Sequence, residues 1–253
     1  MNWRTPIKLV RLFVQVKNPW PLIRDRLGLQ KTPYILYLRT GLRQELRPAW
    51  GDLSAFREIW IQKNYLSSGG RLAKGHTVID VGANIGCFSL FAAQEVGPEG
   101  RVIAVEPDFE TFRQLQRNVK LNSFKNVQIL RTAVAGQPGV VRLYHNSISV
   151  YSSIYSSVDG RSDSDEVEEV PSVTINGIFE EQKIKCCHFL KLNCEGAEYA
   201  IVRNLTANIA ERIGQISMEL HKVEGCDSND LIDRLETLGF VTHSRGPFLF
   251  CNR

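Results

Sequence analysis

A short apolar run that breaks into a glycine-rich turn constrains this chain more than any other feature. The run is residues 78–81, the turn holds Gly82 and Gly86, and a second apolar run, residues 102–105, ends on Glu106 and Pro107. Glycines at a strand-to-helix turn let the backbone approach a ligand without a Cβ in the way. A carboxylate that ends the next strand can accept both hydroxyls of a ribose. The pattern predicts an α/β fold with a nucleoside-binding edge.

Asp80 indicates which nucleoside this edge would take. It lies at the end of the first run, two residues before Gly82. A pyrophosphate would be repelled by a carboxylate at this turn, whereas a ligand with an ammonium and a sulfonium group would be attracted. We therefore expect S-adenosylmethionine here, and the same argument disfavours a nicotinamide dehydrogenase. The alternative role for Asp80 is to cap the helix that follows.

The residues around this turn resemble the first motifs of class I methyltransferases. The longer run 78–90, with 97–102 and Glu106-Pro107, is similar to the FkbM family of O-methyltransferases. The likeness continues through residues 117–122, 190–198 and 218–221, and upstream through 38–43 and 52–59, so that it covers about residues 35–253. Its most specific element is the box Glu195-Gly196-Ala197-Glu198.

The resemblance implies a Rossmann-like α/β class I methyltransferase sheet with strand order 3-2-1-4-5-7-6 and strand 7 antiparallel. We expect residues 1–75 to be an N-terminal extension of helices and a short hairpin, packed on a methyltransferase domain of residues 76–253. Apolar runs place the later strands at 127–132, 189–192, 213–220, 240–243 and 248–251, with an added strand at 140–144. We expect an irregular segment at 145–170, in which residues 147–165 form either a mobile lid or a solvated loop.

The carboxyl ends of strands one, four and five would gather polar side chains at one edge of this sheet. The expected cofactor residues are Asp80, Gly82, Asn84, Gly86, Glu106, Pro107, Ala133 and Asn193. The expected catalytic residues are His221, Glu195, Asn193 and Glu219. His221 or Glu195 would be the general base, Asn193 would orient the acceptor, and Glu219 would orient the imidazole of His221. If His221 is the base, turnover should rise with pH through a histidine titration.

The resemblance implies transfer of a methyl group to a hydroxyl of a small molecule or glycan, such as a sugar, a glycolipid or a polyketide-type product. Residues 193–196 lack the Asn-Pro-Pro-aromatic box of enzymes that methylate nucleobases, so we expect no nucleic-acid substrate. Family members usually have aspartate at the position of Asn193, and we expect no metal. Two alternatives stay open: a scaffold protein that binds the cofactor with impaired catalysis, and a carboxylate acceptor.

Composition adds few constraints. The net charge of +4 over 253 residues is too mild to require nucleic acid, and six cysteines without metal spacing suit a reducing cytoplasm. No run is long enough to span a membrane. Residues 3–29 mix basic and apolar side chains, as a helix on an anionic membrane would. We expect this segment instead to pack on its own domain or against a second subunit in a homo-oligomer.

Overall fold

A mixed seven-stranded sheet forms the centre of the protein in the computed structural model, which describes residues 12–66, 69–145, 153–155, 157–158, 161–162 and 167–253. Its order is β13-β14-β12-β11-β3-β4-β5. The strands are β3 (Thr77–Val81), β4 (Arg101–Val105), β5 (Val127–Leu130), β11 (Phe189–Leu192), β12 (Gln215–Glu219), β13 (Val241–Arg245) and β14 (Phe248–Asn252). Only β14 runs antiparallel to its neighbours. Numbered along the chain, this is the order 3-2-1-4-5-7-6, so the expected topology is confirmed.

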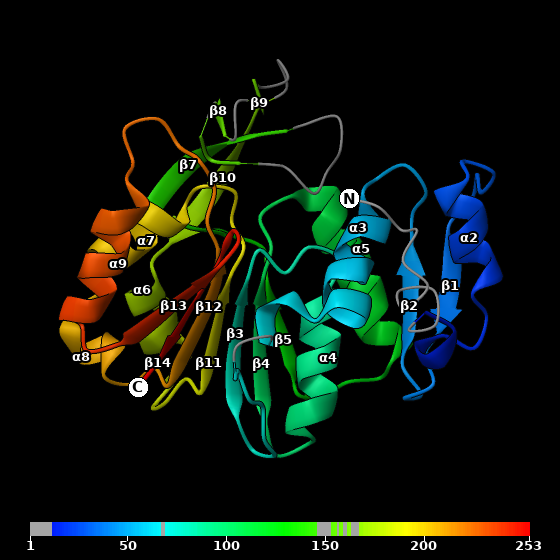
Figure 1. Ribbon diagram of the computed structural model, residues 1–253, viewed down its shortest axis with the longest axis horizontal. Helices are drawn as coiled ribbons and strands as arrows, with labels where there is room; N and C mark the ends of the chain where they lie inside the picture. Colours follow the sequence, from blue (N-terminus) through cyan, green and yellow to red (C-terminus); the bar gives the residue numbers. More distant parts are fainter. Residues whose placement is uncertain (1–11, 67–68, 146–152, 156, 159–160, 163–166) are drawn as a thin grey trace.

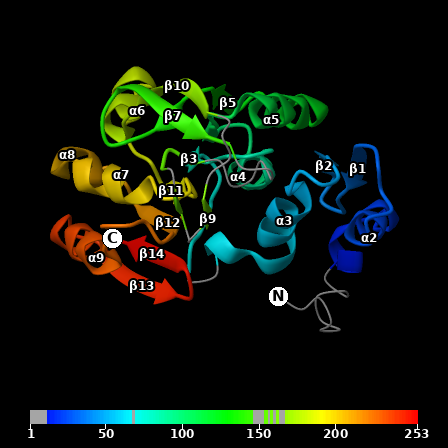
Figure 2. The same cartoon turned by 90° about the horizontal axis from the view of Figure 1, so that it is seen from above.

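Helices cover both faces of this sheet (Figures 1 and 2). On one face lie α4 (Cys87–Val96) and α5 (Phe109–Leu121), and on the other lie α6 (Ile175–Glu181), α7 (Glu198–Asn204), α8 (Ala207–Ala210) and α9 (Ser228–Thr237). Coverage on both sides explains why the parallel strands read as continuous apolar runs and not as alternating ones. The strand side chains then divide between two cores, with Phe189 on the α4 side and Leu190 on the α7 side.

The N-terminal extension packs on the α4 face. It contains α2 (Trp20–Arg26), the antiparallel pair β1 (Tyr34–Tyr37) and β2 (Arg43–Leu46), α3 (Asp52–Phe56), a π-helical turn η1 (Arg57–Gln62) and a 3-10 turn η2 (Asn64–Leu66). The expected hairpin is therefore present. Asn118 of α5 links the hairpin to this helix, because its Oδ1 accepts the backbone N–H of Glu45 at 2.7 Å.

The start of the predicted helix, residues 3–11, lies outside the described residues. From Leu12 onward, Leu12 and Val16 are buried against the rest of the chain. Among the described residues, no helix is both long and apolar enough to cross a bilayer. The six cysteines are free thiols, and the expected cytoplasmic location stays a prediction.

A small sheet stands over the carboxyl ends of the parallel strands, at the top of Figure 1. It comprises β6 (Ala133–Val134), β10 (Val167–Val173) and β7 (Gly139–Tyr144), beside the short pair β8 (Ser157–Val158) and β9 (Arg161–Ser162). The prediction of an irregular segment over residues 145–170 is wrong at β8 and β9 and again from Val167 onward. Val170 is buried while Glu169 is exposed, so this end of the segment alternates as a strand with one covered face does. Most of the proposed lid, residues 147–165, lies outside the described residues.

Candidate active site

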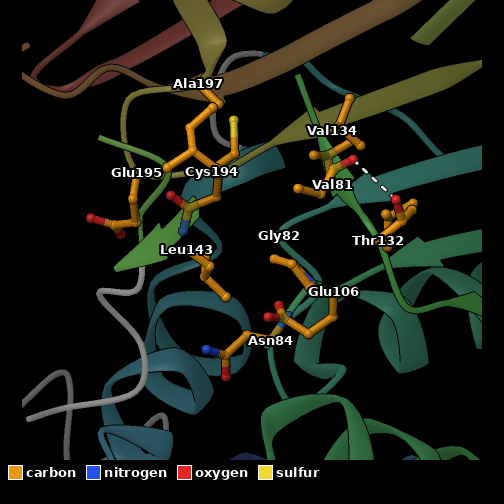
Figure 3. Close-up of a pocket in the computed structure, with 15 residues that line it drawn as sticks. Val81, Gly82, Asn84, Glu106, Thr132, Val134, Leu143, Cys194, Glu195 and Ala197 are labelled. Carbon is orange, nitrogen blue, oxygen red and sulfur yellow. Dashed lines mark hydrogen bonds between the residues drawn. The ribbon is translucent and has the colours of Figure 1, made fainter. Parts of the chain in front are cut away.

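A pocket of about 600 Å³ opens at the carboxyl ends of β3, β4 and β11 (Figure 3). Glu106 and Glu195 approach it from different sides, and Gly82 lies between them in this view. The lining residues are Val81, Gly82, Asn84, Val105, Glu106, Pro107, Thr132, Ala133, Val134, Leu143, Ile154, Asn193, Cys194, Glu195 and Ala197. Of the eight expected cofactor residues, six line the pocket, and Asp80 and Gly86 do not.

Glu106 ends β4 and is held by the backbone around it. Its carboxylate accepts the N–H of Asn84 at 2.8 Å and the N–H of Asp108 at 3.0 Å. Burial, and then the charge of Asp108, raise the pKa of Glu106 to about 8 against those two hydrogen bonds. A ligand that donates hydrogen bonds to this carboxylate would favour its ionised form.

The turn after β3 requires glycine at two places for different reasons. A Cβ on Gly82, at φ +67°, would lie 1.7 Å from the carbonyl oxygen of Asn193, so this residue lets the ends of β3 and β11 meet. A Cβ on Gly86, at φ +86°, would lie 2.6 Å from Leu115 of α5. Gly86 therefore serves the packing of α4 on α5, away from the pocket.

Asp80 is fully buried and belongs to an ion pair. Its Oδ1 lies 2.8 Å from Nζ of Lys191 on β11, and its Oδ2 accepts the hydroxyl of Ser89 at 2.6 Å. Lys191 also donates to the carbonyl oxygen of Gly82 at 3.0 Å. The charge that the sequence argument assigned to a ligand is thus balanced inside the sheet. Asp80 therefore stabilises the turn indirectly, through Lys191, which also binds the Gly82 carbonyl.

The loop after β11 brings Asn193 and Glu195 to the pocket. Glu195 has φ +47°, an uncommon backbone conformation for a residue with a side chain, and such positions cluster at functional sites. Its carbonyl oxygen accepts the Ser153 hydroxyl at 2.5 Å, and Glu198 fixes the loop by accepting the Gly196 N–H at 2.9 Å. Oδ1 of Asn193 is buried and accepts no hydrogen bond from the residues that the structure describes.

His221 lies between two carboxylates behind this loop. Its Nδ1 is 3.1 Å from Oε1 of Glu198, and its Nε2 is 3.5 Å from Oε1 of Glu195. Burial alone would lower the pKa of His221, but the hydrogen bonds and charges of both glutamates outweigh it and raise the pKa to about 11. With that pKa the imidazole carries a proton at neutral pH, so this geometry does not favour the expected rise of turnover through a histidine titration there.

Glu219 occupies a different place from the one expected. The ring of His221 is oriented by Glu195 and Glu198, whereas Oε2 of Glu219 accepts the Tyr65 hydroxyl at 3.2 Å. Burial, and then repulsion from Glu195, raise the pKa of Glu219 despite the opposing charge of His221. Burial and the charge of Glu219 likewise raise the pKa of Glu58, on η1, to about 7. Three carboxyl groups thus meet on the side of the site nearest the extension.

Several residues of this site were missed from the sequence. Leu143 and Ile154 line the pocket from the small sheet and the segment after it, and Glu58 and Tyr65 reach the acidic side from the extension. Lys191 had a readable signal, because a lysine inside a buried strand needs a carboxylate partner. Among the described residues, no group of three or more His, Cys, Asp or Glu side chains is arranged to hold a metal ion.

Comparisons with known proteins show which proteins this chain is similar to. The family model described as "Methyltransferase FkbM domain" matches residues 80–242. The chain is 27% identical over 221 residues to the 31-O-demethyl-FK506 methyltransferase FkbM of Streptomyces tacrolimicus, covering 77% of this chain and 84% of that protein. It is 25% identical over 207 residues to Methyltransferase 1 of Beauveria bassiana, covering 76% and 82%.

A solved structure is also similar to this chain. The crystal structure of methyltransferase FkbM from Methylobacillus flagellatus KT matches with a TM-score of 0.48 and 17% identity. The match covers 74% of this chain and 46% of that one.

Proposed function

Because the chain belongs to the FkbM family of S-adenosylmethionine-dependent methyltransferases, we propose that it moves the methyl group of that cofactor to a hydroxyl group of a small molecule or glycan. The observation that carries this proposal is the pairing of a nucleoside-type pocket with an acidic loop at its other side. The Streptomyces tacrolimicus relative supports it, since its name gives as substrate a compound that lacks a methyl group on oxygen.

The residues of the pocket fit the cofactor. The carboxylate of Glu106 would accept the two ribose hydroxyls, which would offset the cost of its burial. The unpartnered Oδ1 of Asn193 is an acceptor suited to the ammonium group, and it takes the role that the sequence argument gave to Asp80. When bound, the cofactor supplies a methyl group that an oxygen nucleophile can attack in line.

Glu195 is our candidate for the general base. An alcohol is a poor nucleophile at neutral pH, so a base must take its proton as the new bond forms. Glu195 lines the pocket, whereas His221 lies behind it with its pKa raised to about 11 and has no free lone pair to offer. The imidazolium of His221 would instead hold the Glu195 carboxylate in place from 3.5 Å.

The charges around this side of the pocket favour a neutral acceptor. A carboxylate acceptor would meet the carboxylate of Glu195 at the pocket. Like charges brought together in a poorly solvated site repel strongly. We therefore retain the hydroxyl group as the acceptor and, as the sequence indicates, propose no nucleic-acid substrate.

Incubation with methyl-labelled S-adenosylmethionine tests this proposal. Sugars, glycolipids and polyketide alcohols would each be offered beside a carboxylate analogue, and mass spectrometry would detect the added methyl group. A product that survives mild base is a methyl ether, as we expect, whereas a base-labile product is an ester and would show a carboxylate acceptor. Tight cofactor binding with no product from any acceptor would favour the scaffold alternative.

A further inference from the structure

The N-terminal extension exposes an unusual share of large apolar side chains. Of the eleven large hydrophobic residues that the structure describes as exposed, seven lie between Phe13 and Trp50. None of them lines the methyl-transfer pocket or touches its acidic side. Contiguous exposed apolar surface on a folded protein usually marks a site of interaction with another molecule.

Helix α2 presents this surface as an ordered stripe. Trp20 and Leu27 lie seven residues apart, which places them on the same side of a helix, and they are 67% and 65% exposed. Leu22 on the other side is 1% exposed and anchors the helix to the hairpin. Leu29, two residues beyond Leu27, is 58% exposed. In Figure 1, α2 and β1 lie at the opposite end of the molecule from α8 and β13.

The basic charge of the chain is concentrated at the same end. Among the described residues, 12–46 hold six lysines and arginines against two acidic residues, a net charge of +4, whereas the rest hold 22 against 21, a net charge of +1. Arg24 shares the exposed stripe of α2 with Trp20 and Leu27. Exposed tryptophan and leucine flanked by arginine and lysine is the composition of surfaces that settle into an anionic bilayer interface.

A basic cleft lies directly beside the stripe. Its lining includes Arg26, Lys31 and Arg47 together with Asp25. Asp52 balances Arg47 through a contact of 3.0 Å. Burial, and then the charge of Arg26, lower the pKa of Arg57, so Arg26 also lies near a second cation outside the cleft. An anionic group entering the cleft would relieve that repulsion.

We propose that the N-terminal extension is a membrane-docking surface: Trp20, Leu27 and Leu29 enter the interface of an anionic bilayer while the cleft at Arg26 and Lys31 takes a lipid phosphate. Packing of this segment on its own domain and docking are compatible, because Leu12, Val16 and Leu22 face inward while the stripe faces outward. A second copy of the chain is the weaker partner, since symmetric pairing would bring two strongly basic surfaces together.

Vesicle co-sedimentation of the full chain tests the proposal. Vesicles of phosphatidylcholine alone would be compared with vesicles that also contain phosphatidylglycerol. We expect binding to the anionic vesicles only, weakened by added salt because the attraction is screened. Fluorescence of Trp20 should shift to the blue on binding, and that shift should be absent in Trp20→Phe.

Two double variants separate the apolar and the charged contributions. Leu27→Ser with Leu29→Ser should weaken vesicle binding at least about tenfold through lost apolar burial. Arg26→Gln with Lys31→Gln should weaken it on the order of 20-fold through lost attraction to the anionic surface. Val241→Ser and Arg245→Gln, exposed residues on β13 at the other end, are the matched controls and should leave it unchanged.

Calorimetric titration with S-adenosylmethionine shows that each variant is folded, and it keeps this proposal distinct from the proposed methyl transfer. Equal binding of wild type and all variants to both kinds of vesicle would overturn docking through this surface. So would the absence of any binding to anionic vesicles. A dimer in light scattering that the Leu27 and Leu29 variants disrupt would assign the surface to a second copy of the chain and would equally refute membrane docking.

Discussion

The two sides of the pocket are built in different ways. On the cofactor side, Glu106 is held by two backbone N–H groups, and Gly82 lets two strand ends meet. On the acceptor side, Glu195, His221 and Glu198 hold one another through charge and hydrogen bonds, and Glu219 is bonded to Tyr65 of the extension. Geometry that depends on backbone hydrogen bonds and glycines is encoded in a short sequence motif. Geometry that depends on charged side chains changes with their protonation states. Those protonation states are set by residues distant in sequence.

Removing the carboxylate of Glu195 gives the largest expected effect. Glu195→Gln should cut turnover by about 10²–10⁴-fold because the acceptor hydroxyl loses its base. Single-turnover assays with an accepted substrate measure the chemical step directly. Glu180→Gln, an exposed change on α6, is the control. Near-normal turnover in Glu195→Gln would show that Glu195 is not the general base. The two sides of the pocket would then differ only in what they bind.

Substitution of Asp80 tests whether this residue stabilises the fold or binds the cofactor. Asp80→Asn should lower the free energy of unfolding by about 3–5 kcal/mol, because Lys191 would be left buried without its partner. Denaturant titration measures this loss, and the double variant Asp80→Asn with Lys191→Met should recover most of it. If Asp80→Asn instead keeps full stability and weakens S-adenosylmethionine binding, Asp80 acts on the ligand as the sequence argument held.

The pKa of Glu106 makes cofactor affinity depend on pH. With that pKa raised to about 8, the free protein holds a proton on Glu106 at neutral pH. Two ribose donors favour the carboxylate, so affinity for S-adenosylmethionine should rise about tenfold between neutral pH and pH values above 8. Titration calorimetry at a series of pH values measures this rise. Glu106→Gln should show a flat profile, and the same rise in that variant would assign the titration to another group.

The raised pKa of His221 predicts a smaller effect on stability. The folded pKa of about 11 exceeds the ordinary value of 6.5, so the folded state binds this proton more tightly than the unfolded state. The stabilisation is complete below about pH 6.5 and is lost progressively as the pH rises toward 11. Denaturant titrations should show wild type losing its advantage over His221→Gln across this window. An advantage that grows with pH would contradict the protonated imidazole.

The fold was predictable because its signals are local. Continuous apolar runs mark β3, β4 and β11, and the short turn at Gly246-Pro247 requires the last two strands to be antiparallel. Strand β10 was not predictable in the same way. Its acidic beginning, with Glu168 half-buried and Glu169 exposed, is compatible with either a strand or a loop.

The candidate site was predictable only in part. Glu106 and Asn193 could be placed because the end of a parallel strand points to the ligand edge whatever surrounds it. The protonation of His221 could not, since it arises from Glu195 and Glu198 on another element, and the buried lysine at 191 indicates that it needs a carboxylate but not which one. Glu58 lies on the extension, far along the chain from Glu219 and Glu195. No local sequence pattern predicts that it lies near them.

One measurement tests the division into two sides most directly: calorimetric titration of S-adenosylmethionine into wild type, Glu106→Gln and Glu195→Gln. Glu106→Gln should bind at least about tenfold more weakly, through loss of charge-assisted hydrogen bonds to the ribose. Glu195→Gln should bind within about threefold of wild type, because its carboxylate serves the acceptor. Equal affinity of Glu106→Gln and wild type, or a large loss confined to Glu195→Gln, would contradict the account.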